Sequence, residues 1–169
     1  MTSGITIVPA EKKDLPLISD MAPEIWQHAY GRILSPEQIT YMLDMMYARR
    51  VLETAYDNGV KFRLICSDGN PVGFFSFFEC PEERSVIKLD KLYLGSAFHG
   101  KGIGSAALNY LTECASDAGY SAIRLNVNKL NKRAITAYLR NGFKKKESVK
   151  ADIGNGFFMD DYIMEKKLF

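Results

Sequence analysis

The sequence has few of the residues from which disulfide frameworks and metal centres are built. Its 169 residues include three cysteines, Cys66, Cys80 and Cys114, and two histidines. The cysteines are odd in number and form no C-x-x-C pair, so their spacing indicates neither a disulfide framework nor a structural zinc site. We therefore expect no metal, and we expect all three cysteines to be small buried apolar residues.

Long apolar runs and an excess of charge of one sign are also absent. No apolar run approaches the roughly 20 residues of a membrane-spanning helix, and the N-terminus lacks the basic start and apolar core of a secretory signal. The 22 basic and 20 acidic residues give a formal net charge of +2, which provides no general electrostatic case for nucleic-acid binding. We expect a cytoplasmic protein that binds neither membranes nor nucleic acids. The sequence leaves the oligomeric state open, with a homodimer among the alternatives.

The residues that are present predict one globular domain with a substantial core. Hydrophobic residues make up 47% of the chain and charged residues 25%, which is typical of a folded domain. Ser35, with Gln38 three residues later, has the pattern of a capping box that begins a helix, and Asp14 is expected to cap an earlier helix with its side chain. The Asp68-Gly69 pair is typical of a hairpin turn.

Hydrophobic periodicity gives the expected order of the elements. The expected helices cover residues 14–30, 35–47, 49–58, 103–118 and 131–141, and the expected strands cover residues 4–8, 85–94, 122–128, 143–149 and 157–168, with two more strands within 61–79. No repeat or linker interrupts this order. It predicts a single α/β domain over residues 1–169 with a mixed sheet.

Three glycines at alternating positions, Gly100, Gly102 and Gly104, lie between an apolar run and a helical segment. A helix N-terminus offers amides and the positive end of the helix dipole, and glycines let the backbone approach a phosphate closely. Lys101 adds a mobile cation beside a diphosphate. The structural alternative is a glycine-rich connection that only turns a strand into a helix. Neither the Rossmann fingerprint, whose last glycine falls on Ser105, nor the Walker pattern fits this loop.

Two spaced segments resemble the GNAT superfamily of acyl-CoA N-acyltransferases. Residues 89–111, LDKLYLGSAFHGKGIGSAALNYL, look like its motif A, whose loop is usually written (Q/R)-x-x-G-x-(G/A). The three specified positions fall on His99, Gly102 and Gly104, so His99 stands where glutamine or arginine is usual. Residues 128–143, NKLNKRAITAYLRNGF, are similar to its N-x-x-A-x-x-x-Y-x-x-x-G-F signature. Asn131, Ala134, Tyr138, Gly142 and Phe143 meet that pattern.

The resemblance implies the fold, the cosubstrate and the residues that bind it. The GNAT fold is a mixed central sheet of about six to seven strands flanked by helices, splayed between the strand before the glycine loop and the next strand. Acetyl-CoA would be the cosubstrate. The backbone of Leu92, Tyr93 and Leu94 would pair with its pantetheine arm and stabilise the oxyanion, and Asn131 would contact the pantetheine side. The diphosphate would lie on the loop, formed by His99, Gly100, Lys101, Gly102, Ile103, Gly104 and Ser105.

The resemblance also supplies a proton donor for the reaction. Tyr138 matches the superfamily's usual general acid, and a phenol can donate to the departing thiolate while staying neutral beforehand. The structural alternative is that Tyr138 is a packed aromatic, spaced with Ile135 and Leu139 on one helix.

The general base is less determined by the sequence. Glu79 and Asp90, at the ends of strands, are the candidate bases, acting directly or through water. Either acid is equally explained as a solvated charge at a strand end. Asn126 and Asn128 are candidates to orient a water in such a site, although strand asparagines often only satisfy the backbone.

The acceptor is expected to be a primary amine, with a polyamine or another small cationic amine favoured. Residues 24–43 and 152–168 look similar to the polyamine-acetyltransferase-like branch of the superfamily. Trp26 and Tyr30 are candidate walls of an amine channel, although aromatic residues at helical spacing are more often core. Asp160 and Asp161 are candidate ammonium ligands, and as neighbours on a strand they should point to opposite faces. The alternatives are a protein or peptide N-terminal acetyltransferase, a non-catalytic acyl-CoA-binding sensor and a nucleotide-binding domain of another class.

Overall fold

A computed structural model describes residues 4–169. Met1–Ser3 lie outside the described residues. They begin the N-terminal segment that lacks the features of a secretory signal. The described strands form a seven-stranded mixed sheet in the order β1-β2-β3-β4-β5-β7-β6. The chain divides into two compact units, one of Met1–Phe78 with Lys91–Ala107 and the other of Glu79–Asp90 with Leu108–Phe169. Strand β4 (Val86–Leu94) and helix α4 (Ile103–Asp117) contribute to both units.

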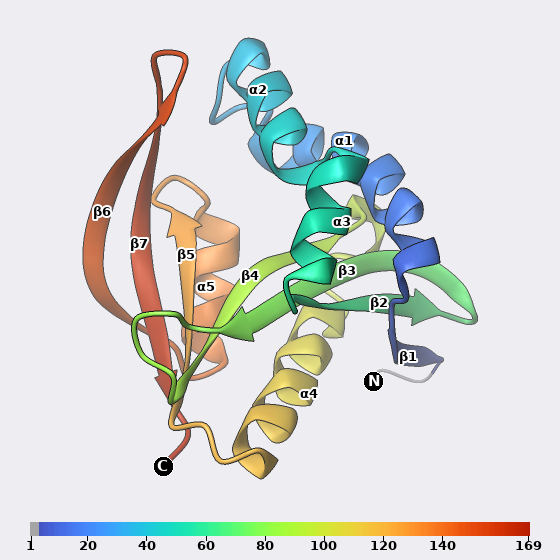
Figure 1. The fold of residues 1–169 in the computed structure, drawn as a ribbon, viewed down its shortest axis with the longest axis vertical. Helices are drawn as coiled ribbons and strands as arrows, with labels where there is room; N and C mark the ends of the chain where they lie inside the picture. Colours follow the sequence, from blue (N-terminus) through green and yellow to red (C-terminus); the bar gives the residue numbers. More distant parts are fainter. Residues whose placement is uncertain (1–3) are drawn as a thin grey trace. The chain divides into compact units, whose positions relative to one another are not determined.

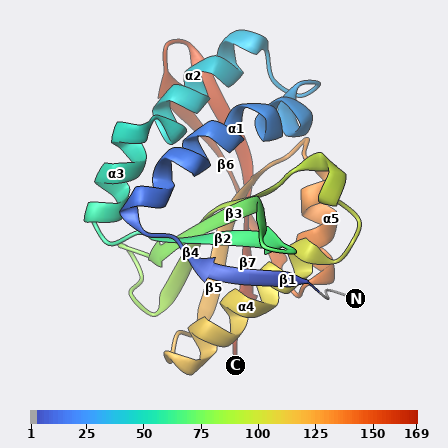
Figure 2. The ribbon, with the colours of Figure 1, turned by 90° about the vertical axis from the view of Figure 1, so that its right-hand side faces the viewer.

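The first unit contains three helices on one side of three antiparallel strands. Figures 1 and 2 show α1, α2 and α3 together over β1, β2 and β3. β1 pairs antiparallel with β2, and β2 pairs antiparallel with β3. The helices are α1 (Leu15–Tyr30), α2 (Pro36–Tyr47) and α3 (Arg49–Asp57), and the strands are β1 (Ile5–Pro9), β2 (Lys61–Ser67) and β3 (Asn70–Glu79).

Local chemistry explains where several elements of the first unit begin and turn. Ser35 Oγ accepts a hydrogen bond from the Gln38 amide at 3.1 Å, so the predicted cap of α2 is confirmed. The hairpin between β2 and β3 turns at Asp68 and Gly69, whose φ values of 49° and 82° are those of a two-residue turn with both residues left-handed. The prediction for Asp14 was wrong. Its carboxylate accepts from the Glu11 amide behind it at 2.8 Å, closing a short 3-10 turn, and makes no cap bond to α1.

The second unit is built on the first half of β4 and three further strands. β4 runs parallel to β5 (Ala122–Asn128), β5 runs antiparallel to β7 (Phe157–Lys167), and β7 runs antiparallel to β6 (Lys144–Gly154). The β4–β5 ladder covers only Val86–Leu89 and Ala122–Leu125.

The hairpin of β6 and β7 is longer than the sequence predicted (Figure 1). β6 was expected to end at Val149, but it continues to Gly154. The two strands are joined by Asn155 and Gly156, with φ values of 55° and 80°. Asn-Gly is a strong hairpin signal. That signal would have given the correct strand length.

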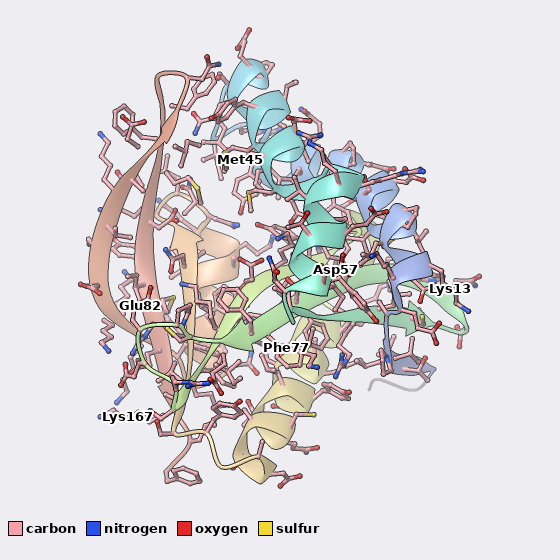
Figure 3. The ribbon with its side chains drawn as sticks, in the orientation of Figure 1. Lys13, Met45, Asp57, Phe77, Glu82 and Lys167 are labelled. Atoms are coloured by element: carbon pink, nitrogen blue, oxygen red, sulfur yellow. The ribbon has the colours of Figure 1, made fainter. Side chains whose placement is uncertain are left out.

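One of the three cysteines differs from its prediction. Cys66 and Cys80 are buried, as expected, and the Cys80 thiol donates to the carboxylate of Glu82, labelled in Figure 3, at 3.1 Å. Cys114 is exposed. The buried side of α4 is centred on Ile103, Ala107, Leu108, Leu111 and Ala115, so the helix is rotated relative to the apolar stripe that would bury Cys114.

Candidate active site

The glycine loop leads from the end of β4 to the first turn of α4 in the first unit. Gly100 and Gly102 have φ values of 73° and 78°, which L side chains rarely adopt, and a Cβ at either position would meet no atom within 4 Å. The first intrahelical hydrogen bond runs from the Ala106 amide to the Gly102 carbonyl at 3.0 Å. The first amides of an α-helix generally have no acceptor within the helix, so a helix start reached through glycines is typical of an anion site.

His99 and Lys101 flank the first glycine of this loop. His99 Nε2 lies 3.0 Å from the carbonyl oxygen of Leu94, so the ring ties the loop back to the end of β4. The Lys101 ammonium lies 5.7 Å from the centroid of the Phe98 ring and remains exposed. This arrangement gives His99 a role in holding the loop. The predicted contacts of His99 and Lys101 with a diphosphate stay predictions.

The end of β4 approaches β3 closely in the first unit. A Cβ at Gly73 would collide with the carbonyl oxygen of Tyr93, and the Gly95 amide donates to the Val72 carbonyl at 2.9 Å. Leu92, Tyr93 and Leu94 are half-buried. The use of their backbone by pantetheine stays a prediction.

Trp26 and Tyr30 belong to an aromatic cluster in the core of the first unit. Their exposed fractions are 1% and 7%, and the Tyr30 hydroxyl lies 2.9 Å from that of Tyr93. The Trp26 ring also lies beside those of Tyr47 and Tyr93, with centroid distances of 5.6 and 5.7 Å. This burial supports the structural explanation of both residues, and their contact with an acceptor stays a prediction.

A pocket that the sequence did not predict lies in the first unit. It has a volume of about 180 Å³ and lies beside Gly95 and Phe98, next to the glycine loop. Glu24 and His28, one turn apart on α1, supply its titratable groups. The remaining lining residues are Met21, Ile25, Pro71, Val72 and Ser96.

Tyr138 lies on α5 (Lys132–Arg140) of the second unit, and Asn131 directly precedes this helix. Asn131 is the N-cap, and its Oδ1 accepts from the Ala134 amide at 3.3 Å. The half-buried Tyr138 ring packs edge-on against the buried ring of Phe143, with centroids 5.6 Å apart. Leu139 is exposed and Ile135 is buried, so the alternative in which Tyr138 is only a packed aromatic stays open. Phe143 thus holds the tyrosine that the second motif specifies.

Of the two candidate bases, Glu79 is engaged by other groups of the second unit. Arg84 Nε donates to it at 2.9 Å and the Tyr120 hydroxyl at 3.0 Å. The Arg84 hydrogen bond, supported by that of Tyr120, lowers the pKa of the Glu79 carboxyl. A carboxylate with a lowered pKa is a weaker base, which argues against this role. Asp90 is exposed and lies on β4, two residues after Lys88.

Asp160 and Asp161 point to opposite faces of β7, as predicted. Asp161 is 4% exposed, whereas the Asp160 side chain is 52% exposed and pairs with the Lys129 ammonium at 3.0 Å. Burial raises the pKa of Asp161, while the nearby charge of Lys88 opposes the shift. Lys88 was not singled out by the sequence. It donates to Asn126 Oδ1, and burial lowers its pKa.

Asn128 has the structural role that the sequence left open. Its Oδ1 accepts from the Leu130 amide at 2.9 Å and so closes the turn after β5. Among residues 4–169, no group of three or more histidine, cysteine or acidic side chains gathers as a metal would require. No helix in this range is long and apolar enough to cross a membrane.

Comparison with known proteins identifies the family. The profile of the Acetyltransferase (GNAT) family matches residues 21–143. The chain belongs to the GNAT acetyltransferase family. An uncharacterised N-acetyltransferase of Mycobacterium tuberculosis is 29% identical over 136 residues, which cover 80% of this chain and 85% of that protein. The family and such relatives support acetyl-CoA-dependent acyl transfer.

Two further relatives come from Thermoplasma acidophilum. A spermidine N(1)-acetyltransferase is 24% identical over 92% of both chains. The crystal structure of a PaiA N-acetyltransferase in complex with coenzyme A has a TM-score of 0.81 and 26% identity, and covers 96% of this chain and 98% of that one. The GNAT fold and the likeness to a polyamine-acetyltransferase branch are therefore confirmed. A Methanocaldococcus jannaschii N-acetyltransferase is 37% identical over 87 residues, and this chain spans only 38% of its length.

Proposed function

We propose that this GNAT acetyltransferase transfers the acetyl group of acetyl-CoA to a primary amine of a small cationic molecule, by direct attack of nitrogen on the thioester. The observation that carries the proposal is the open glycine loop at the start of α4. Gly100 and Gly102 leave space in front of the backbone, and the helix dipole favours an anion there. The diphosphate of the coenzyme lies on the loop in this proposal, from His99 to Ser105.

The other roles follow the two family motifs. The backbone of Leu92, Tyr93 and Leu94 pairs with pantetheine, and an amide of this strand stabilises the oxyanion of the tetrahedral intermediate. Asn131 contacts the pantetheine side. Tyr138 donates a proton to the coenzyme thiolate as it leaves. Its ring is held by Phe143, which supports this role because a positioned donor is more effective than water.

A polyamine is the favoured acceptor. The support is the likeness to proteins named spermidine N(1)-acetyltransferase and PaiA N-acetyltransferase, the latter at 26% identity. The exposed carboxylate of Asp160 is the better candidate for holding a second ammonium, because Asp161 is buried and already faces Lys88. An incoming ammonium would exchange with Lys129, whose ion pair with Asp160 is partly exposed and therefore weak.

A thiol-release assay with acetyl-CoA tests the proposal. The acceptor panel is spermidine, spermine, amino acids, an aminoglycoside and peptides with free N-termini. We expect release with the polyamines above the rate of hydrolysis without acceptor. If only peptide N-termini are acetylated, the polyamine assignment is wrong and acetyl transfer stands. If no amine of the panel accelerates release although coenzyme A binds, catalysis itself is refuted and a coenzyme sensor is favoured.

A further inference from the structure

The last residues of β4 lie against a glycine of β3 in the first unit. Gly73 does not have a left-handed φ, unlike Gly100 and Gly102, so its backbone conformation does not require a glycine. A Cβ at Gly73 would instead collide with the carbonyl oxygen of Tyr93 and with Leu94. A glycine inside a strand normally weakens the strand, and it often marks the close approach of another backbone. Gly73 is therefore explained by the space that the end of β4 occupies.

A β-bulge next to Gly73 provides a second contact with this end of β4. The register of β2 with β3 shifts between Ile65 and Cys66, which leaves Val72 of β3 as an extra, bulged residue. The Val72 carbonyl accepts a hydrogen bond from the Gly95 amide, directly after β4, at 2.9 Å. Bulges redirect a strand and are over-represented next to active sites. The bulge and Gly73 together fix the end of β4 from the β3 side.

Helix α1 contacts the same part of β4 through its aromatic residues. The hydroxyl oxygens of Tyr30 and Tyr93 lie 2.9 Å apart and share a hydrogen bond. The buried ring of Trp26 lies beside both tyrosines, with centroid distances of 4.6 and 5.7 Å. A close-packed cluster of this kind resists displacement of its members. Tyr93 is therefore fixed twice, by its ring from α1 and by its carbonyl from β3.

These contacts decide which edge of β4 presents the backbone of Leu92 and Leu94. The peptide groups of successive residues in a strand point alternately to its two edges. The Tyr93 carbonyl oxygen lies next to β3, and the Gly95 amide donates to β3. The peptide groups of Leu92 and Leu94 therefore point to the opposite edge, where His99 Nε2 meets the Leu94 carbonyl oxygen at 3.0 Å. The ladder of β4 with β5 includes neither leucine.

We propose that Gly73 and Tyr30 are positioning residues, which set the backbone of Leu92–Leu94 at the place where the pantetheine arm pairs with it. This inference rests on the proposed function, in which this edge of β4 binds pantetheine. Neither positioning residue touches the coenzyme; both act through Tyr93. The diphosphate lies on the glycine loop at the start of α4 in the same proposal. A displaced β4 should therefore weaken binding of the arm much more than binding of the diphosphate.

The test compares the binding of two ligands by isothermal titration calorimetry. One is coenzyme A, and the other is adenosine 3′-phosphate 5′-diphosphate, which is coenzyme A without its pantetheine arm. We expect Gly73→Ala to raise the Kd of coenzyme A by about tenfold or more, the weight of one or more hydrogen bonds, because the added Cβ displaces the Tyr93 carbonyl. The Kd of the nucleotide should stay unchanged.

Ala115→Val is the control for crowding in a buried place. Ala115 is a small residue of α4 in the second unit and is 2% exposed, so a larger side chain overpacks its surroundings without reaching β4. This variant should have a lower melting temperature, and the ratio of its two Kd values should be that of the wild type.

Tyr30→Phe tests the contact from α1 without crowding, because the ring still packs and only the hydrogen bond to Tyr93 is lost. It should raise the Kd of coenzyme A by a smaller factor than Gly73→Ala does, and it should leave the Kd of the nucleotide unchanged. Tyr56→Phe on α3 is its control and should change neither Kd.

The outcomes separate this inference from the proposed function. A wild-type protein that binds coenzyme A no more tightly than the nucleotide refutes the proposed pairing with pantetheine, and this inference with it. If the wild type prefers coenzyme A and Gly73→Ala keeps that preference, this inference alone is refuted. Equal weakening of both ligands in Gly73→Ala also refutes it, because that result indicates a general loosening of the unit. If Gly73→Ala does not fold, an unchanged preference in Tyr30→Phe refutes the inference.

Discussion

At the scale of single residues, a side chain becomes a functional candidate through the contacts that fix it. Tyr138 is held edge-on by Phe143, at the end of the motif that names both residues. Glu79 has the residue type of a base, but its hydrogen bonds to Arg84 and Tyr120 lower its pKa. Residue type and position along a strand therefore do not determine a proton-transfer role until the partners are known.

Tyr138→Phe should lower kcat by about 10²-fold while leaving coenzyme affinity nearly intact, because the ring still packs and only the proton is lost. The measurement is thiol release under conditions where chemistry limits the rate, together with coenzyme binding by thermal shift. Tyr56→Phe, a half-buried tyrosine of α3, is the control and should be without effect. Unchanged turnover in Tyr138→Phe would mean that water or another group protonates the thiolate.

Asp160→Asn should raise the KM of a polyamine more than it lowers kcat. A contact with a distal ammonium is present in both the ground state and the transition state, so its loss weakens binding of both equally. A monoamine without a second ammonium should show the same KM in the wild type and the variant. Equal polyamine KM values would remove Asp160 from acceptor recognition.

At the scale of elements, backbone conformation shapes the glycine loop, whereas ion pairs between side chains join strands β5, β6 and β7. The loop relies on left-handed backbone at Gly100 and Gly102 to present the start of α4. The three strands are joined by Glu165 on β7, which lies 2.6 Å from Arg124 of β5 and 3.2 Å from Lys146 of β6. The first arrangement is proposed to bind a ligand, and the second stabilises the fold.

Gly102→Val should remove most of the thermal stabilisation that coenzyme A confers, because a branched side chain fills the space in front of the loop. Gly119→Val is the matched control for backbone strain. Gly119 also has a left-handed φ, of 86°, and a Cβ there would also meet no atom within 4 Å. Gly119→Val should lose intrinsic stability and keep its response to the coenzyme. An equal coenzyme response in wild type and Gly102→Val would contradict the placement of the diphosphate.

Glu165→Gln should lower the free energy of unfolding at pH 7 by about 1.5–3 kcal/mol, the range for hydrogen bonds to a charged group. Burial pushes the pKa of Glu165 upward, but the hydrogen bonds from Arg124 and Lys146 outweigh it, so the pKa lies below its ordinary value of 4.5. Its stabilisation is therefore present above that value and is lost as the pH falls through the folded pKa. Urea unfolding at pH 7 and at pH 3 should show the difference from wild type shrinking in acid, whereas Glu147→Gln should stay within about 0.5 kcal/mol at pH 7.

At the scale of the whole molecule, the coenzyme should act as part of the folded state. A ligand that binds only the native chain adds about 2.7 kcal/mol of stability at a hundredfold excess over its Kd. For a protein of this size that corresponds to a rise in Tm of roughly 5–10 °C. Coenzyme A and acetyl-CoA should both produce this shift, and pantetheine, which lacks the diphosphate, should produce much less. An equal shift with pantetheine would contradict the role of the glycine loop.

The sequence by itself determined the features that depend on neighbouring residues along the chain. The order of helices and strands, the Ser35 cap, the Asp68-Gly69 turn and the opposite faces of Asp160 and Asp161 all follow from local backbone rules. The two motifs identified the family for the same reason, since each is a short pattern within one loop or helix.

Only the tertiary structure decided the features that depend on residues distant in the chain. The register of β4, β5 and β7 brings Lys88, Asn126 and Asp161 together, although 73 positions separate Lys88 from Asp161. Burial is set by what packs against a helix, which is why Trp26 lies in the core and Cys114 is exposed. Solvation and charge at a carboxylate depend on these distant neighbours, so the contrast between the lowered pKa of Glu79 and the raised pKa of Asp161 follows from the packed sheet and not from the order of residues.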